Sequence, residues 1–278
     1  MKTIYTLANL KIELETLKEN KNKIGLVPTM GALHNGHASL VQKAKSENDL
    51  VLTTIFVNPT QFNNPEDLKK YPRKAEEDIK LLDMIGCDIL FMPNTEEIYA
   101  NYEVPGIELG LLDTIMEGKQ RPGHFQGVCQ IVYRLFEIIQ PTNAYFGLKD
   151  FQQVAVIRYM TNYFNLPVNI IACETVREEN GLAMSSRNLR LTETQKKDAL
   201  VLFNTLQFIK NSYQQETPIT AKEKALDFFN RGNLTLEYLE IVNPNTLEAL
   251  SNEWVDGAIA CIVAFAGDIR LIDNMKIN

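Results

Sequence analysis

The sequence predicts an α/β fold, with a parallel sheet covered by helices and a smaller α+β domain toward the C-terminus. Strand-like apolar runs alternate with helix-like periodic runs from about residue 24 to residue 173, a rhythm typical of parallel sheets. After about residue 187 the strand-like runs cluster without helices between them. A chain of 278 residues is long enough for one large domain or two moderate ones.

Each element of the first domain is predicted from composition and periodicity. The runs typical of strands are apolar and often β-branched, and they cover 24–28, 50–58, 88–93, 143–147 and 168–173. The runs with helical periodicity cover 37–48, the second half of 65–86, 127–141 and 150–164. Pro72 is expected to break or start a helix, and Pro141 is expected to end one.

The C-terminal part predicts two helices followed by three strands. A long helix is expected over 192–213, with Thr192 as its N-cap, and a second helix near 220–232. The strands are expected over 236–242, 258–266 and 269–275, with a hairpin turn between the last two. We therefore divide the chain into domains of residues 1–178 and 179–278.

Composition and charge argue against several classes of function. The chain is 45% hydrophobic with a formal net charge of −7, which disfavours a surface for nucleic acid or acidic lipid but allows a local pocket for a small anion. Four widely spaced cysteines without a CxxC pair favour reduced, mostly buried thiols in a cytoplasmic protein. No signal peptide and no apolar run of membrane-spanning length is visible, so no membrane partner is expected.

The stretch PTMGALHNGH (28–37) places two of the three histidines between a predicted strand and a predicted helix. Ligands of open parallel sheets bind at the carboxyl ends of strands, and a helix N-terminus there favours phosphate. Gly31 and Gly36 allow the backbone to approach a ligand, and His34 and His37 could hydrogen-bond phosphate or protonate a leaving group. The alternatives are a turn with two surface histidines and a metal site, for which no third ligand is evident nearby.

Two further polar segments follow predicted elements. In FGLKDFQQ (146–153), Lys149 could contact phosphate and Asp150 could cap a helix or accept from a ligand hydroxyl. In VREENGLAMSSRNLRLT (176–192), hydroxyls and Arg187 could close over a triphosphate. The respective alternatives are a capped helix with solvated side chains and a linker.

Two other segments offer groups for a small polar substrate. Asn58 and Gln61 in FVNPTQFNNPEDLKKYPR (56–73) are uncharged amides that could orient such a molecule, and Arg121 in RPGHFQGV (121–128) could pair with a carboxylate. A Pro/Asn turn and a surface loop are the corresponding alternatives.

HNGH resembles the His-x-Gly-His signature that nucleotidylyltransferases and class I aminoacyl-tRNA synthetases use on ATP phosphates. Together with FVNPTQF, YPR, RPGHFQGV, YFGLKDFQQ and GLAMSSRN, in this order, it resembles the pantothenate synthetase (pantoate–β-alanine ligase) family over most of the first two thirds of the chain. Two positions depart from the family pattern: Asn180 stands where aspartate is usual, and Thr60 where a larger apolar residue is usual.

The resemblance implies a Rossmann-like domain that binds ATP and pantoate, and a C-terminal domain that closes over the ATP site. It implies an AMP-forming ligase of pantothenate and coenzyme A biosynthesis, which condenses (R)-pantoate with β-alanine through pantoyl adenylate and releases AMP and pyrophosphate. ATP would be a substrate, and Mg²⁺ would bind through its phosphates with no dedicated protein ligands. The family also implies a cytoplasmic homodimer.

The resemblance also assigns residues to roles. The catalytic residues would be His34, His37, Lys149 and Arg187, with His37 as the proton donor. Gln61 and Gln153 would hold pantoate, and Gln61 would also lie near β-alanine. The ATP site would comprise Met30, Gly31, Ala32, Leu33, His34, Asn35, Gly36, His37, Gly147, Leu148, Lys149, Asp150, Val176, Met184, Ser185, Ser186 and Arg187.

Two other functions stay open at the level of sequence. A nucleotidylyltransferase of the same superfamily with another acceptor would share the His-x-Gly-His site but would not need Gln61 and Gln153. An RNA-binding module derived from a synthetase is disfavoured by the pI of about 5.2 and by the lack of Lys/Arg clusters.

Overall fold

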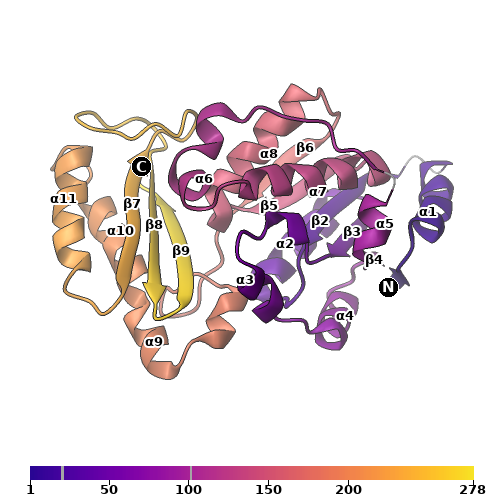
Figure 1. The fold of residues 1–278 in the computed structure, drawn as a ribbon, viewed down its shortest axis with the longest axis horizontal. Coiled ribbons are helices and arrows are strands. Elements are labelled where there is room, and N and C mark those ends of the chain that lie inside the picture. Colours follow the sequence, from indigo (N-terminus) through magenta and orange to yellow (C-terminus); the bar gives the residue numbers. More distant parts are fainter. Residues whose placement is uncertain (20–21, 101) are drawn as a thin grey trace. The chain divides into compact units, whose positions relative to one another are not determined.

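The computed structural model describes residues 1–19, 22–100 and 102–278, and the chain divides into two compact units. The first unit comprises Met1–Gly147 and Gln152–Glu174, and the second comprises Leu148–Phe151 and Thr175–Asn278. The short segment Leu148–Phe151 therefore belongs to the second unit, although the chain on either side of it belongs to the first. Figure 1 labels most of the helices and strands of both units.

A parallel sheet of six strands forms the centre of the first unit, in the order β1-β4-β3-β2-β5-β6. The strands are β1 (Lys2–Ile4), β2 (Ile24–Thr29), β3 (Leu50–Ile55), β4 (Ile89–Phe91), β5 (Asn143–Gly147) and β6 (Asn169–Cys173). Every pairing in this sheet is parallel, which confirms the predicted parallel sheet. The edge strand β1 was not predicted, because three residues are too few for a period-two pattern to stand out.

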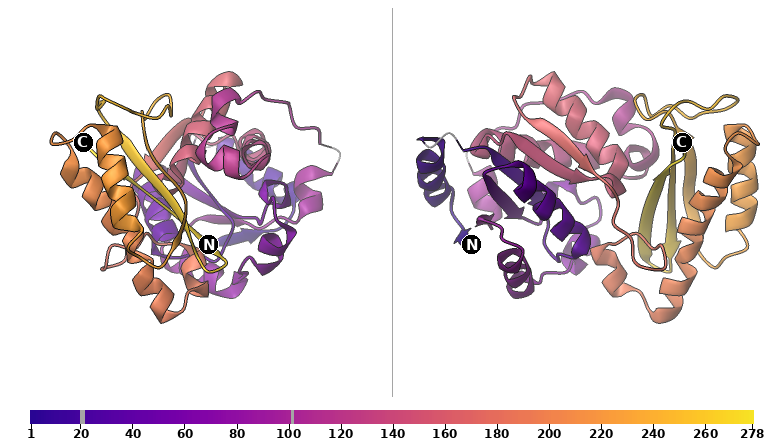
Figure 2. Two further views of the ribbon diagram at one scale, coloured as in Figure 1. Left: turned by 60° about the vertical axis from the view of Figure 1, so that its left-hand side comes forward. Right: turned by 180° about the vertical axis from the view of Figure 1, so that it is seen from behind.

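Helices cover both faces of this sheet (Figures 1 and 2). They are α1 (Leu7–Glu19), α2 (Asn35–Glu47), α3 (Pro65–Lys70), α4 (Ala75–Met84), α5 (Thr95–Tyr99), α6 (Met116–Gln120), α7 (His124–Ile139) and α8 (Phe151–Tyr163). Leu26 of β2 joins the apolar core formed with α1, α7 and α8, while its neighbour Val27 joins the core formed with α2 and α4. Because successive strand residues point to opposite faces, both faces of the strand must be apolar, as the continuous run at 24–28 indicated.

The two strands β2 and β5 mark the topological switch point of the sheet. From β2 the chain proceeds through β3 to β4 on one side, and from β5 it proceeds to β6 on the other. Pairing between β2 and β5 covers only Gly25 and Leu26, whereas β2 pairs with β3 from Ile24 to Thr29. Pro28, which has no N–H to donate, lies beyond the last β5 pair. The histidine segment 28–37 continues from β2, and the Lys149 segment 146–153 continues from β5. Ligands of open parallel sheets bind outside the carboxyl ends of the strands at such a switch point.

The second unit is an α+β unit with one antiparallel sheet in the order β7-β8-β9. Its elements are α9 (Glu193–Asp198), α10 (Leu200–Ser212), α11 (Pro218–Phe229), β7 (Thr235–Val242), β8 (Ile259–Ala266) and β9 (Ile269–Lys276). Apolar residues of α10 and α11 share one core with the sheet. This arrangement confirms the predicted α+β class and the predicted hairpin between the last two strands.

Two predicted helices differ from the structure. The expected helix over 192–213 is interrupted: α9 ends at Asp198 and α10 begins at Leu200. Thr192 is the N-cap as predicted, and it forms a capping box with Gln195. The segment 65–86 is helical in both halves rather than only in the second, because the Asn64 side chain accepts from the backbone N–H of Glu66 and caps an extra helix, α3.

The four cysteines are free and buried, as predicted. Burial raises the pKa of Cys129 to about 12 and that of Cys173 to about 11. These two thiols are therefore protonated at neutral pH and poor nucleophiles. Among the described residues, no helix has the length and apolar character needed to span a membrane.

Candidate active site

The loop after β2 brings the two histidines of HNGH together. His34 is the N-cap of α2, and its Nδ1 accepts from the backbone N–H of Gly36 at 3.1 Å. The Nδ1 of His37 accepts from the backbone N–H of His34 at 3.3 Å, and the two ring centroids are 4.1 Å apart. Since each Nδ1 is an acceptor, a neutral ring carries its proton on Nε2. The structure thus places the two imidazoles side by side at the start of α2.

A buried carboxylate on α4 fixes the turn that precedes these histidines. Gly31 and Ala32 both have positive φ angles, 79° and 50°, and the second is unfavourable for a residue with a Cβ. Asp78, only 2% exposed, accepts from the N–H of Ala32 at 2.8 Å and from the N–H of Leu33 at 2.7 Å. Burial raises the pKa of Asp78 while these two hydrogen bonds act in the opposite direction. Because both amides are engaged by Asp78, any contact of these residues with a nucleotide would use other atoms.

Gln61, which follows β3, lies against the first residue of the same loop. The Gln61 side chain is buried; its Oε1 accepts from Asn58 Nδ2 at 3.1 Å and its Nε2 donates to Met30 Sδ at 3.2 Å. These contacts fix which way the Gln61 amide points. The structure therefore brings Gln61, a predicted pantoate contact, next to Met30, a predicted ATP contact.

Asn58 and His124 hold Gln61 in place. The Oδ1 of Asn58 accepts from the Tyr99 hydroxyl at 2.7 Å, and its Nδ2 also donates to Gly127 O at 3.0 Å, so this buried amide serves the fold. The Nδ1 of His124 lies 2.8 Å from Gln61 O, and its Nε2 lies 3.1 Å from Arg121 Nη1. The polar atoms of Asn58 that were considered for a substrate contact are therefore hydrogen-bonded within the protein, where they support Gln61.

The structure separates the two neighbouring glutamines at the start of α8. Gln152 is buried, donates to the carbonyls of Leu112 and Ile115 at 2.9 and 3.0 Å, and accepts from the N–H of Glu117 at 2.9 Å. Its amide is therefore engaged in the fold of the first unit. Gln153 is half-buried and stays the predicted pantoate contact.

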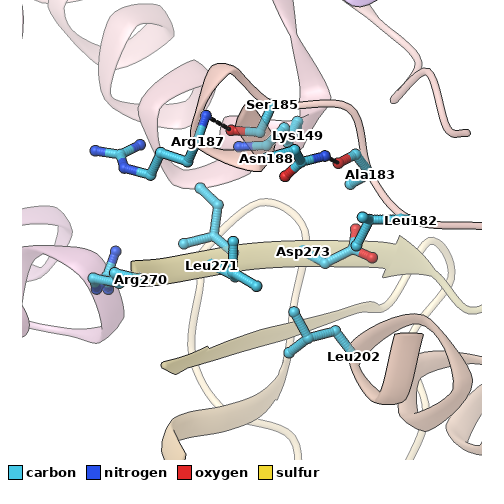
Figure 3. A pocket seen from close by; sticks show the side chains of 11 residues that line it. Lys149, Leu182, Ala183, Ser185, Arg187, Asn188, Leu202, Arg270, Leu271 and Asp273 are labelled. Atoms are coloured by element: carbon cyan, nitrogen blue, oxygen red, sulfur yellow. Dashed lines mark hydrogen bonds between the residues drawn. The ribbon is translucent and has the colours of Figure 1, made fainter. Parts of the chain in front are cut away.

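In the second unit, Lys149, Ser185 and Arg187 line one pocket above strand β9 (Figure 3). The other lining residues are Leu182, Ala183, Asn188, Leu202, Arg270, Leu271, Ile272 and Asp273. The Lys149 ammonium lies 3.9 Å from the Asp150 carboxylate. Three cationic side chains at one pocket make it suited to an anionic ligand.

The segment that carries Arg187 is held by its own polar groups. The Ser185 hydroxyl accepts from the N–H of Arg187 at 3.3 Å and caps the short 3₁₀ helix Ser186–Arg190. The N–H of Met184 donates to Val176 O at 3.0 Å, which places these two predicted ATP contacts side by side. At the departure from the family pattern, Asn180 Oδ1 accepts from the N–H of Leu182 at 3.1 Å, a bond that an aspartate oxygen would also make.

Sequence reasoning missed Asp78 and the polar pair Asp273 and Asn274. Asp78 stands four residues before the buried Leu82 of α4, so a carboxylate occupied the apolar side of a helix. Asp273 and Asn274 interrupt an apolar strand, and both are buried. Buried polar groups in apolar periodic positions are the signal that could have found them.

Within the described part of the chain, no group of three or more His, Cys, Asp or Glu side chains is placed to hold a metal ion.

Comparisons of the sequence support one family. Residues 2–276 match the family model described as pantoate-beta-alanine ligase. A protein of Cytophaga hutchinsonii named pantothenate synthetase is 47% identical over 281 residues, covering 100% of this chain and 99% of the relative. A pantothenate synthetase of Bacteroides thetaiotaomicron is 46% identical and covers 99% of both chains.

Solved structures agree with the sequence comparisons. The pantothenate synthetase of Thermus thermophilus superposes with a TM-score of 0.94 at 41% identity, covering 100% of this chain and 99% of that chain. The pantoate–β-alanine ligase of Francisella tularensis, complexed with beta-gamma ATP and β-alanine, has a TM-score of 0.83 at 36% identity and covers 99% of this chain and 97% of that chain. These full-length matches do not favour a nucleotidylyltransferase with another acceptor. The chain thus belongs to the pantoate–β-alanine ligase family.

Proposed function

We propose that the predicted site residues carry out this family's reaction, the ATP-dependent condensation of pantoate with β-alanine through pantoyl adenylate. The observation that carries the proposal is the origin of the two motifs: the histidine loop and the Lys149 segment leave the sheet from the neighbouring strands β2 and β5. As a member of the family, the chain is an AMP-forming ligase. The proposal concerns which residues bind the substrates and which catalyse the two steps.

ATP would be bound by the residues that the family resemblance assigns to it. In the first unit, the Nε2 protons of His34 and His37 and the N-terminus of α2 would face the phosphates, since both favour negative charge. In the second unit, Lys149 and Arg187 would neutralise phosphate oxygens, with Ser185 fixing the loop. Closure of the C-terminal domain over ATP is part of this proposal. Val176, Met184 and Ser186 would complete the nucleotide site.

The first step would join pantoate to the α-phosphate. A carboxylate oxygen of pantoate attacks the α-phosphorus, the bond from that phosphorus to the bridging oxygen breaks, and pyrophosphate leaves. Lys149 and Arg187 would stabilise the charge on the departing pyrophosphate. To act as the proton donor, His37 would enter this step as an imidazolium, with its Nδ1 released from the hydrogen bond to the His34 N–H, and would leave the step as a neutral ring. The product is a mixed anhydride whose carbonyl carbon is open to attack.

The second step would form the amide. The neutral amine of β-alanine attacks the anhydride carbonyl, the bond to the AMP oxygen breaks, and the amine proton passes to solvent. The amides of Gln61 and Gln153 would hold pantoate by its hydroxyl and carboxyl groups so that the carbonyl lies within reach of the amine. This is consistent with the Gln61 amide being held by Asn58 before any substrate arrives.

Three further expectations belong to the proposal. Mg²⁺ would arrive on ATP and bind through the phosphates, where it would offset their charge. The protein would form a homodimer, which sedimentation or light scattering would detect. It would work in the cytoplasm.

The test is product formation by the purified protein. With Mg-ATP and pantoate alone we expect pyrophosphate and bound pantoyl adenylate in an amount near that of the enzyme, and with β-alanine added we expect continuous formation of AMP, pyrophosphate and pantothenate. His37→Ala should lower the adenylation rate by about 100-fold or more. Absence of AMP from the complete mixture would refute the function, and an unchanged rate in His37→Ala would remove His37 from its role.

A further inference from the structure

The segment Leu148–Phe151 is attached to the second unit by one side chain of β9. The Nδ2 of Asn274 donates to the carbonyl of Leu148 at 2.8 Å and to the carbonyl of Lys149 at 2.8 Å. Asn274 is 8% exposed, so these bonds are largely shielded from water. They cross 126 and 125 residues of sequence and join this segment to β9 of the same unit.

Asn274 is itself held rigidly. Its backbone N–H donates to Asp273 Oδ1 at 2.7 Å, and its carbonyl accepts from Arg177 Nη2 at 3.0 Å. Arg177 also binds both oxygens of Asp273, at 2.7 and 2.9 Å. Because Asp273 is 4% exposed and its pair with Arg177 is bidentate, the strand position that carries Asn274 has little freedom.

The chemistry of these contacts selects an asparagine. Both hydrogens of one –NH₂ group are directed at two consecutive carbonyls, and no other side chain of this length offers two donors on one nitrogen. The side chain of Lys149 lies with Ser185 and Arg187 at the pocket shown in Figure 3. The backbone of Lys149 is therefore hydrogen-bonded to β9, the strand that lines one side of this pocket.

We propose that Asn274 is a positioning residue that holds Lys149 beside Arg187, so that both cations meet the same phosphate groups. The inference rests on the proposed role of Lys149 toward ATP. Asn274 does not touch substrate; it acts through the backbone of Lys149. Without it, the segment would still follow β5 but would lose its attachment to β9.

The test is the kinetics of Asn274→Ala and Asn274→Asp, with Asn274→Ser as a milder variant that keeps one donor. We expect the KM for ATP to rise roughly tenfold, while the KM for pantoate and for β-alanine stays within about twofold. Asn274→Asp should show the largest rise, because its carboxylate would face two carbonyl oxygens.

Asn278→Ala is the matched control. The Nδ2 of Asn278 also donates twice, to Val255 O at 3.0 Å and to the Tyr213 hydroxyl at 3.1 Å, but it has no bond to the Lys149 segment. We expect Asn278→Ala to lose about as much thermal stability as Asn274→Ala, with no change in the KM for ATP. An equal rise in that KM in Asn278→Ala would show that general loosening of the unit is the cause, and it would overturn the proposal.

A double-mutant cycle with Lys149→Ala decides whether Asn274 acts through Lys149. In the Lys149→Ala background, Asn274→Ala should add little to the KM for ATP. Additive effects, or a normal KM for ATP in folded Asn274→Ala, would contradict the inference. If instead the wild-type protein forms no AMP from ATP, pantoate and β-alanine together, the proposed function itself fails.

Discussion

Asp78 is the residue on which the geometry of the histidine loop depends most. It satisfies the amides of Ala32 and Leu33 in a turn where both Gly31 and Ala32 have positive φ. Backbone held in this way is maintained only when its surroundings fix it. The loop is thus shaped before ATP arrives, which lowers the cost of placing the imidazoles.

Asp78→Asn should impair adenylation. An amide offers one oxygen to two N–H donors, so one donor would face the –NH₂ group instead, at a cost of about 1–3 kcal/mol in stability. Displacement of the histidines should lower kcat by about 10–100-fold. The control is Asp49→Asn. Asp49 also accepts from a backbone N–H, that of Lys23 at 2.7 Å, but it lies where β2 and β3 begin, at the end away from the histidine loop. Equal rates in both variants would count against the role of Asp78.

The two adjacent glutamines predict opposite phenotypes. Gln153→Ala should raise the KM for pantoate by about tenfold with little change in melting temperature, because its proposed partner is the substrate. Gln152→Ala should lower the melting temperature, because it removes the hydrogen bonds of Gln152 to the carbonyls of Leu112 and Ile115 and to the N–H of Glu117. Steady-state kinetics and thermal melts of both variants check this, and exchanged phenotypes would reverse the assignment.

At the scale of elements, helix α7 approaches the Gln61 turn at a glycine. A Cβ on Gly127 would stand 2.4 Å from Thr60 O and 2.6 Å from Gln61 N, both backbone atoms that cannot rotate away. The helix and the turn can meet this closely only without a side chain. The position of Gln61 therefore depends on Gly127 as well as on Asn58.

Gly127→Ala should move the turn and damage both stability and pantoate binding. We expect a loss of about 1–3 kcal/mol from overpacking and a raised KM for pantoate. In Gly106→Ala, where a Cβ would meet nothing within 4 Å, neither change is expected. Chemical denaturation and kinetics measure both. Normal pantoate binding in Gly127→Ala would show that the turn tolerates displacement.

The elements show where sequence patterns succeed and where they fail. Runs such as 143–147 were predicted to the residue, because a fully buried parallel strand leaves a continuous apolar signal. The break at Ala199 was missed, since the residues around it are good helix formers and nothing local marks an interruption. The extra helix α3 was missed because Asn64, its N-cap, was interpreted only as part of a Pro/Asn turn.

At the scale of the whole molecule, each unit has its own apolar core. The α10 residue Leu206 is fully buried in the core of the second unit, and Leu135 of α7 is buried in the core of the first. The alternation of strands and helices predicted the first core, and the cluster of late strands predicted the second. Membership of Leu148–Phe151 in the second unit could not be predicted, because this segment contacts β9, which lies more than 100 residues later in the sequence.

Leu206→Ala should loosen the second unit selectively. Removing a fully buried leucine costs about 2–5 kcal/mol, so amide hydrogen exchange should accelerate in β7, β8 and β9. Exchange in β2 and β5 should change much less, and Leu135→Ala should show the reverse pattern. Uniform acceleration across both sheets in either variant would mean that the two cores unfold as one.

The central claim is that pantoate is activated through its own carboxylate oxygen as an adenylate. It is tested most directly with pantoate labelled with ¹⁸O in the carboxylate, Mg-ATP and β-alanine, by mass spectrometry of the released AMP. The account predicts one ¹⁸O in the phosphate of each AMP and none in pyrophosphate. Unlabelled AMP, or label in inorganic phosphate or pyrophosphate, would contradict it.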